Sequence, residues 1–321
     1  MSAFQPAAAP DIATLSGSTM GTRFTVAYAP PAGRASPGLA EALQAAVEAV
    51  DRDMSTWKVD SALCRFNRAP VGDWIAVPAD LAVVVGEGLA IAQITGGAFD
   101  PVLGRLVDLW GFGPDGFQGQ PSAEALDQAR AESGFEAVRV RDAPPALLKT
   151  APRSLDLSGI AKGFGVDRLA ETLEGEGIAD YLVTLDGEVR VKGRKGVHGP
   201  WQVAVDAPVF GRSEPYDILW PPTGALATSG DYRQRRSAGR RTWSHTIDGR
   251  TGEPVDNALG SVTVAMDKCV QADAWASALL VLGPDEGPAL AQAKGVAALF
   301  LVREDEGVRA ILTGGFERVI G

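Results

Sequence analysis

Residues 259–282 read LGSVTVAMDKCVQADAWASALLVL, a strand pattern that passes within a few residues into a helix pattern. Leu259 to Met266 is rich in β-branched and apolar residues and is expected to be a strand, and Cys269 to Leu282 is expected to be a helix. Further strands are expected over residues 181–191, 201–205, 225–234 and 241–247. Because these strands follow one another without regular crossover helices, they favour an antiparallel sheet. The predicted fold class is therefore α+β.

The rest of the chain is expected to add helices, mostly before this strand-rich part in the sequence, and a hairpin after it. Apolar residues at helical spacing predict helices over residues 39–54 and 80–94, and further helices are expected over 122–133, 163–173 and 285–294. Strands are expected over 23–28, 296–302 and 308–313. With no internal repeat or long linker in view, the predicted organisation is a flexible tail over residues 1–14 and a single domain over residues 15–321.

Composition narrows the class of ligand. The 321 residues carry a formal net charge of -10, which argues against a protein that binds nucleic acid through a general positive field. An anionic ligand would have to be bound by a local site. No run of eighteen apolar residues occurs, so no transmembrane segment is expected.

Two cysteines and the first residues bear on the compartment. Cys64 and Cys269 are far apart and have no metal-binding spacing; two buried thiols are expected, and a disulfide is the alternative in an oxidising compartment. The first eleven residues lack a basic segment followed by an apolar one. The expected location is cytoplasmic for the sequence as written, with periplasmic as the alternative if an export signal has been removed.

The pair Asp273 and Ser277 is the first candidate for chemistry. Four residues apart on a helix, a carboxylate and a hydroxyl share one face and can hold one divalent cation through hard oxygen atoms. The Gly-bracketed run from Ser158 to Gly163 could supply backbone groups to the same place. Mg²⁺ and Ca²⁺ suit such ligands better than zinc. The alternative is an Asp that caps a helix or accepts backbone donors.

Other candidates each have a structural alternative. Asp100 precedes Pro101 and is either an Asx-turn or a carboxylate that accepts hydrogen bonds from a base or sugar. His245 and Asp248 lie where a strand passes into a turn, a setting that suits an acid or base, although a lone histidine is more often structural. The small-residue segment 17–22 is either a plain turn or a loop that lets a flat ligand approach the backbone.

Taken together, these segments resemble the ApbE-type flavin transferases (FAD:protein FMN transferases). The resemblance extends from Ser18 to about Leu282. The matching motifs are Thr19-Met20-Gly21-Thr22, Met54-Ser55-Thr56-Trp57 with Asp60-Ser61, Gly96 to Pro101, Asp156 to Asp167, Ser229-Gly230-Asp231-Tyr232, Ser244 to Gly252 and Ala272 to Leu279.

The resemblance implies a T-fold-like α+β architecture, with largely antiparallel sheets packed with helices, that binds FAD and Mg²⁺. It also implies that FMN passes from FAD to a Thr or Ser hydroxyl of an acceptor flavoprotein, with release of AMP. The implied metal ligands are the Ala161 carbonyl, Asp273 and Ser277. The implied contacts to FAD are Met20, Trp57, Ala98, Phe99, Asp100, Lys162, Phe164, Asp167 and Ile247. His245 is the first choice for a catalytic base, with Asp231 and Asp248 as alternatives.

The chain departs from the family pattern in two positions of the expected site. Ser277 stands where Thr is usual, which keeps the oxygen, and Asp186 stands where a second Gly is usual, which adds a charge. Members of the family are often exported lipoproteins, and no lipobox cysteine is present here. Two other functions stay open. One is an Mg²⁺-dependent FAD pyrophosphatase that gives FMN and AMP, and the other is a non-catalytic FAD-binding protein.

Overall fold

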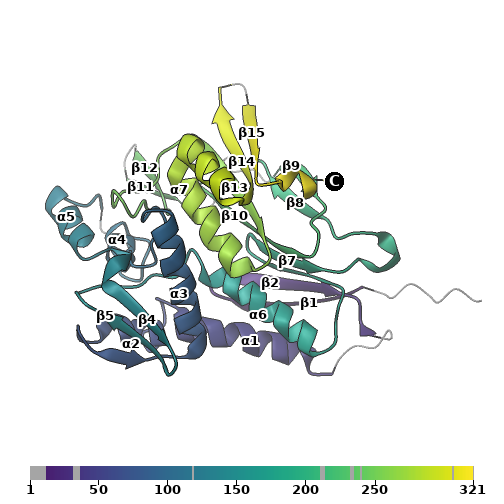
Figure 1. The fold of residues 1–321 in the computed structure, drawn as a ribbon, viewed down its shortest axis with the longest axis horizontal. Helices are drawn as coiled ribbons and strands as arrows, with labels where there is room; N and C mark the ends of the chain where they lie inside the picture. The colour runs from purple at the N-terminus through teal and green to yellow at the C-terminus, as the bar shows by residue number, and fades with distance from the viewer. Residues whose placement is uncertain are drawn as a thin grey trace, which may run out of the picture.

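A computed structural model describes residues 12–31, 37–117, 119–209, 214–231, 235–238, 241–305 and 307–320. Its main element is an eight-stranded antiparallel sheet, which together with the helices confirms the predicted α+β class (Figure 1). The strand order is β1-β2-β6-β7-β10-β13-β14-β15. The strands are β1 (Ala13–Thr19), β2 (Thr22–Tyr28), β6 (Tyr181–Leu185), β7 (Glu188–Lys192), β10 (Gly224–Gly230), β13 (Leu259–Met266), β14 (Ala297–Glu304) and β15 (Gly307–Thr313).

Three small sheets surround the main one. They are β3-β5-β4 (Trp74–Ala76, Pro145–Lys149 and Val138–Asp142), β8-β9 (Val203–Asp206 and Pro215–Leu219) and β11-β12 (Arg235–Ala238 and Arg241–Ser244). Short 3₁₀ turns occur at Phe135–Ala137, Gly196–His198 and Phe316–Arg318.

The helices pack partly on the main sheet and partly on one another or on the sheet β3-β5-β4. They are α1 (Leu39–Met54), α2 (Ala62–Arg68), α3 (Ala79–Ile94), α4 (Gly104–Leu109), α5 (Ala123–Ala131), α6 (Ala161–Gly175) and α7 (Cys269–Lys294). Helix α7 packs on β10 and β13, and α6 packs on β6 and β7 and against α7 (Figure 1). The first turns of α6 and α7 therefore lie next to each other on the sheet.

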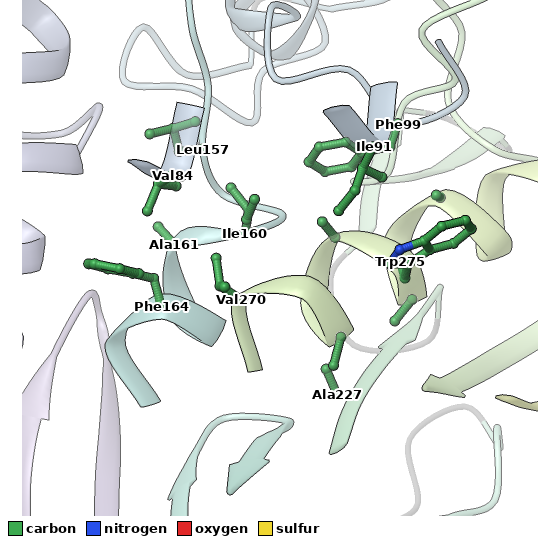
Figure 2. Close-up of a cluster of buried hydrophobic side chains, with 14 of the residues drawn as sticks. Val84, Ile91, Phe99, Leu157, Ile160, Ala161, Phe164, Ala227, Val270 and Trp275 are labelled. Carbon is green, nitrogen blue, oxygen red and sulfur yellow. The ribbon is translucent and has the colours of Figure 1, made fainter. Parts of the chain in front are cut away.

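Both faces of the sheet are buried, as strand β14 illustrates. Because side chains alternate along a strand, Ala298, Phe300 and Val302 face the helices, whereas Leu299 and Leu301 pack with β8, β9 and the C-terminal turn. On the helix face, Phe164 of α6 and Trp275 of α7 belong to one apolar cluster (Figure 2). This core holds α6 and α7 in fixed positions under the cavity described below.

Most predicted elements are present, and several differ. The strand expected over 201–205 spans Val203–Asp206, and the strand expected over 241–247 ends at Ser244. The strand expected over 225–234 ends at Gly230, and residues 232–234 lie outside the described part.

Residues 181–191 form two strands with a turn at Asp186-Gly187, because the alternating pattern of a hairpin reads as one long strand. Residues 17–19, expected in a loop, belong to β1, which pairs with β2 along its whole length. That strand starts at Ala13, inside the range predicted as tail, of which residues 1–11 lie outside the described part.

Within the described ranges, none of the helices has the length and apolar character that a membrane span needs. Both cysteines are free thiols; Cys269 is buried, as predicted, whereas Cys64 is only half-buried.

Candidate active site

A cavity of about 720 Å³ lies where the turns at one end of the sheet meet the first turn of α6 and one face of α7. Its wall combines the β1–β2 turn, the β6–β7 turn, the end of α1 and the loops 98–103 and 245–247. Of the predicted site residues, it brings together Met20, Trp57, Ala98, Phe99, Asp100, Ala161, Lys162, His245, Ile247, Asp273 and Ser277. Segments that are more than 250 residues apart in the sequence, such as those of Met20 and Ser277, thus share one cavity.

Helix α7 positions the two polar residues predicted to bind a metal. Asp273 and Ser277 are one helical turn apart and both line the cavity. The Asp273 Oδ2 atom accepts a hydrogen bond of 2.9 Å from the backbone N–H of Gly163, at the start of α6. The Ser277 Oγ atom lies 3.1 Å from the Ser229 Oγ atom of β10. The two side chains are therefore anchored to neighbouring elements.

The hydrogen bond from Gly163 requires α6 and α7 to approach closely. A Cβ atom at Gly163 would lie 2.4 Å from the Cys269 carbonyl oxygen and 2.8 Å from the Asp273 Cβ atom. No side chain fits in that space without a shift of the backbone. Glycine at this position therefore sets the distance between the two helices.

Charge in this part of the cavity is concentrated around Lys162. Its ammonium lies 2.9 Å from the Glu188 carboxylate and 3.1 Å from the Asp186 carboxylate. Burial lowers the pKa of Lys162, but Glu188, Asp273 and Asp186 outweigh this and raise it above its ordinary value. Burial, and then the charge of Glu188, raise the pKa of Asp273 to about 7. The carboxylates around Lys162 thus outnumber the cationic side chains that contact them.

The predicted metal ligands fit a hard divalent cation by their chemistry. The Ala161 carbonyl, the Asp273 carboxylate and the Ser277 hydroxyl are all oxygen donors and belong to residues that line one cavity. A buried carboxylate beside a second acid is stabilised by a cation, which offsets the cost of desolvation. Among the described residues, no group of three or more His, Cys, Asp or Glu could hold a metal, so a mixed donor set is the one available.

The predicted flavin contacts give the cavity an apolar wall with an aromatic rim. Trp57 is 66% exposed in the loop after α1, and Phe99, Ala98 and Ile247 are buried behind it. Met20 adopts a left-handed conformation, φ 48°, in the turn between β1 and β2. An exposed indole above a buried apolar surface suits a flat ring system.

Asp100 forms the Asx-turn that was one of its two predicted roles, whereas its contact with a base or sugar stays a prediction. Its two carboxylate oxygens accept hydrogen bonds from the backbone N–H groups of Val102, at 2.7 Å, and Phe135, at 3.0 Å. The first bond is the expected Asx-turn before the buried loop, and the residue also lines the cavity. Burial raises the pKa of Asp100 to about 7 in spite of these two donors.

His245 lies on the cavity wall directly after strand β12. Its imidazole ring packs edge-on against Phe112, with 6.4 Å between the ring centroids. It lines the same cavity as the predicted metal ligands and most of the predicted flavin contacts. The position suits a proton acceptor for a group that enters the cavity.

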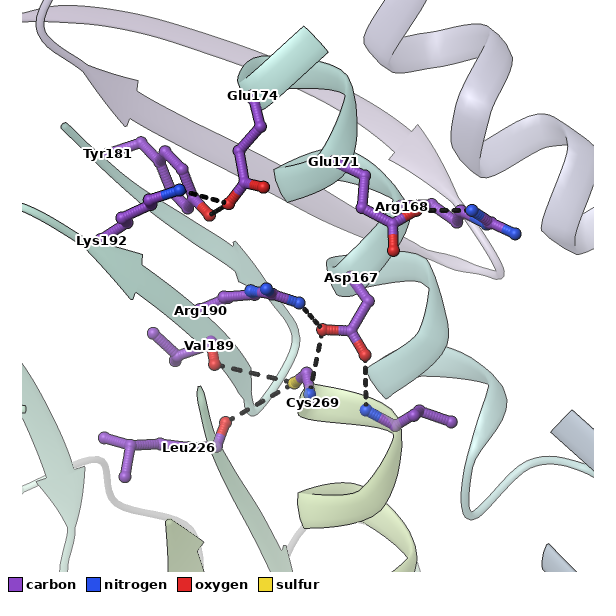
Figure 3. Close-up of polar contacts among 11 residues, drawn as sticks. Asp167, Arg168, Glu171, Glu174, Tyr181, Val189, Arg190, Lys192, Leu226 and Cys269 are labelled. Atoms are coloured by element: carbon purple, nitrogen blue, oxygen red, sulfur yellow. Dashed lines mark hydrogen bonds and ion pairs between the residues drawn. The ribbon is translucent and has the colours of Figure 1, made fainter. Parts of the chain in front are cut away.

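Two predicted flavin contacts have structural roles instead. The wall of the cavity does not include Asp167 or Phe164. Asp167 accepts hydrogen bonds from the first two N–H groups of α7, those of Cys269 and Val270, and forms an ion pair with Arg190 (Figure 3). Phe164 is buried in the apolar cluster under α6 (Figure 2). The sequence motif could not separate these two residues from Ala161 and Lys162, which do line the cavity, because all four lie on helix α6.

The two acids named as alternative bases also lie off the cavity wall. Asp231 forms a two-pronged ion pair with Arg303 of β14. Asp248 accepts hydrogen bonds from the backbone and side chain of Arg250, which also contacts Glu286. Both carboxylates are held by guanidinium groups, so the structure does not support them as bases. Tyr232, in the same motif as Asp231, lies outside the described residues.

Glu188 is a site residue that the sequence analysis did not select. It is 3% exposed and binds Lys162. The sequence contains a pattern that could have identified it. Glu188, Arg190 and Lys192 alternate with two valines along β7, which places the three charges on the helix-covered face. Asp51 and Lys58, an ion pair at the end of α1, also line the cavity.

Comparison with known proteins connects this cavity to a family. A model of the ApbE family matches residues 20–300. The FAD:protein FMN transferase of Vibrio cholerae (strain O395) is 38% identical over 308 residues, which is 94% of this chain and 91% of that protein. The FAD:protein FMN transferase of Escherichia coli K12 is 34% identical over 314 residues, which is 96% of this chain and 89% of that protein.

Solved structures agree with the sequence comparison. The flavin transferase ApbE from Vibrio cholerae superposes with a TM-score of 0.89 at 38% identity, covering 97% of this chain and 99% of that one. The flavinyl transferase ApbE of Pseudomonas stutzeri, in its apo form, gives a TM-score of 0.89 at 35% identity, covering 99% of both chains. These relatives confirm the predicted fold and the predicted enzyme class. The chain belongs to the ApbE family.

Proposed function

We propose that this protein transfers FMN from FAD to a Thr or Ser hydroxyl of an acceptor flavoprotein, with release of AMP and in dependence on Mg²⁺. The observation that carries the proposal is the shared cavity. Its wall holds the three oxygen-donor residues Ala161, Asp273 and Ser277, a lysine, a histidine and an apolar surface with an aromatic rim. The names of the curated relatives support FAD as the substrate and a protein as the acceptor.

The cavity has separate places that suit the isoalloxazine ring and the pyrophosphate of FAD. The apolar wall at Phe99 and Ile247, with Trp57 at the rim, suits the flat isoalloxazine ring. Lys162 lies beside the predicted metal ligands and suits the pyrophosphate. When bound at Ala161, Asp273 and Ser277, Mg²⁺ supplies charge neutralisation for the phosphate oxygens.

The transfer is a displacement at the phosphorus atom on the riboflavin side. The acceptor hydroxyl oxygen forms a bond to this phosphorus, and the bond to the bridging oxygen of the pyrophosphate breaks. AMP leaves with that oxygen, and the hydroxyl proton passes to a base, for which His245 is the best-placed side chain. No electron is transferred, because the flavin is cargo in this reaction.

The test uses the purified protein with FAD, with and without Mg²⁺, and with an acceptor domain that carries a Thr flavinylation motif. Mass spectrometry follows the acceptor, and chromatography follows AMP and FMN. We expect an Mg²⁺-dependent mass gain of one FMN group on the acceptor and one AMP for each transfer. Formation of AMP and free FMN without labelling of the acceptor would indicate a pyrophosphatase. Binding of FAD without either product would indicate a flavin-binding protein.

A further inference from the structure

Two non-glycine residues of the described chain adopt a left-handed backbone conformation, and both line the cavity. They are Met20, with φ 48°, and Asp186, with φ 59°. Asp186 is the first residue of the two-residue turn that joins β6 to β7. Glycine adopts this conformation at no steric cost, and Asp only with some strain. A charged side chain is thus maintained at a position where the backbone favours glycine.

The charge of Asp186 is not needed to hold Lys162. Both Asp186 and Glu188 bind the Lys162 ammonium, at 3.1 and 2.9 Å. The Glu188 side chain is 3% exposed and requires a cation, whereas the Asp186 side chain is 36% exposed and open to solvent. Without Asp186, Glu188 would still fix the ammonium in the cavity. The main contribution of Asp186 is therefore one negative charge at the cavity surface.

That charge adds to an excess of acids around the same space. The acidic residues of the wall are Asp51, Asp100, Asp156, Asp186, Glu188 and Asp273, and its lysines are Lys58 and Lys162. Lys58 is paired with Asp51, and Lys162 is shared by Asp186 and Glu188. A pyrophosphate that enters therefore meets more carboxylates than lysines among the described residues of the wall. A divalent cation in the cavity would reduce this excess of negative charge.

We propose that Asp186 makes FAD binding depend on the divalent cation, because its carboxylate repels the pyrophosphate dianion until a cation is bound nearby. This inference rests on the proposed function, which places FAD and Mg²⁺ in the cavity. Binding linkage is reciprocal: if the bound cation strengthens FAD binding, bound FAD strengthens cation binding by the same factor. Asp186 therefore increases both effects. Asp186 thus favours binding of FAD together with the cation over binding of FAD alone.

Two substitutions separate charge from backbone strain. Asp186→Asn removes the charge, keeps the size and tolerates the left-handed conformation, and Asp186→Gly also removes the strain. Glu171→Gln is the matched control. This residue lies on α6, the same helix as Lys162, its side chain is 50% exposed, and it is not part of the cavity wall. It changes the net charge of the protein by the same amount as Asp186→Asn.

The measurement is the dissociation constant of FAD, from flavin fluorescence, for the full chain in EDTA and in Mg²⁺. In EDTA, we expect Asp186→Asn to bind FAD about three- to tenfold more tightly than wild type, as expected for one charge removed at roughly 8 Å in a high-dielectric medium. The gain should be smaller in Mg²⁺ and should shrink as salt is raised. Glu171→Gln should bind like wild type.

Two results would overturn the role of Asp186. One is FAD binding by Asp186→Asn in EDTA that is no tighter than that of wild type, and the other is an equal gain in Glu171→Gln. If wild type still transfers FMN in either case, only this inference is lost. If wild type binds no FAD even in Mg²⁺, the proposed function is lost, and this inference with it.

Discussion

Two buried aspartates on the contact between α6 and α7 have opposite surroundings. Asp167 projects from α6 and accepts hydrogen bonds from two N–H groups of α7, and Arg190 balances its charge. Asp273 projects from α7 and accepts a hydrogen bond from one N–H group of α6, with Glu188 as a second acid nearby. Hydrogen bonds from the described part of the chain reach only one of the Asp273 oxygens.

The comparison distinguishes a carboxylate that holds the fold from one that is available to a ligand. Groups of the protein engage both carboxylate oxygens of Asp167, so this residue stabilises the junction of the two helices. Asp273 faces the cavity with part of its hydrogen-bonding capacity unused and with its pKa raised to about 7. A cation is the partner that would satisfy it. The two residues should therefore respond differently to substitution.

The largest effect is expected at the cavity. Asp273→Ala should lower the rate of FMN transfer by about 10³-fold, because a metal contributes several kcal/mol to stabilisation of the transition state. The melting temperature should not fall, since the variant removes a buried acid whose pKa is raised by desolvation. Transfer assays and thermal unfolding measure the two quantities. Retention of wild-type activity at limiting Mg²⁺ would remove Asp273 from the metal site.

Asp167→Ala should act mainly on stability. It leaves Arg190 without its buried partner and the first turn of α7 without its cap, and the expected loss is about 3 kcal/mol in the free energy of unfolding. Urea unfolding of the full chain without ligands measures this loss. A variant of wild-type stability that had lost FAD binding would reverse the assignment and return Asp167 to the flavin site.

Asp100 tests an intermediate case, a carboxylate with two backbone donors at a buried site. Its pKa of about 7 lies above the ordinary value of 3.8, so between these values the folded state binds more protons than the unfolded state. Stability should therefore fall as pH rises, with Asp100 contributing about 2 kcal/mol between pH 5 and 7. Asp100→Asn should flatten this part of the stability curve, measured by urea unfolding without metal or FAD. Identical slopes in the two proteins would contradict the raised pKa.

The smallest effect is expected for the spacing between the two helices. Gly163→Ala places a methyl group against the Cys269 carbonyl and the Asp273 Cβ atom, and we expect a loss of about 1–2 kcal/mol with weaker Mg²⁺-dependent FAD binding. Gly175→Ala is the control near the end of α6, where an added Cβ meets no atom within 4 Å. It should be neutral or slightly stabilising. Equal behaviour of the two variants would show that close approach at Gly163 is unimportant.

Local pattern was sufficient for the elements whose own residues define them. The helix predicted over 39–54 has the observed bounds of α1, because Leu43, Val47 and Val50 recur at helical spacing and face the core. The strand 259–266 likewise has the bounds of β13. The division predicted between the last two helices corresponds to Gly283, where the backbone of α7 is not helical. The hairpin at 181–191 was missed because both of its strands are rich in residues that favour strands and only Asp186 and Gly187 separate them.

The sequence alone also determined that Asp273 and Ser277 share a face, because the spacing of four residues on a helix requires it. It could not determine which acids face the cavity. Asp231 is neutralised by Arg303, which is 72 residues away, and Asp167 by Arg190 and the start of α7. Glu188 and Asp186 meet Lys162 only because β7 packs under α6. Local spacing fixes the direction of a side chain on its own element, but long-range packing decides which partner neutralises it, and therefore which carboxylates are left for a ligand.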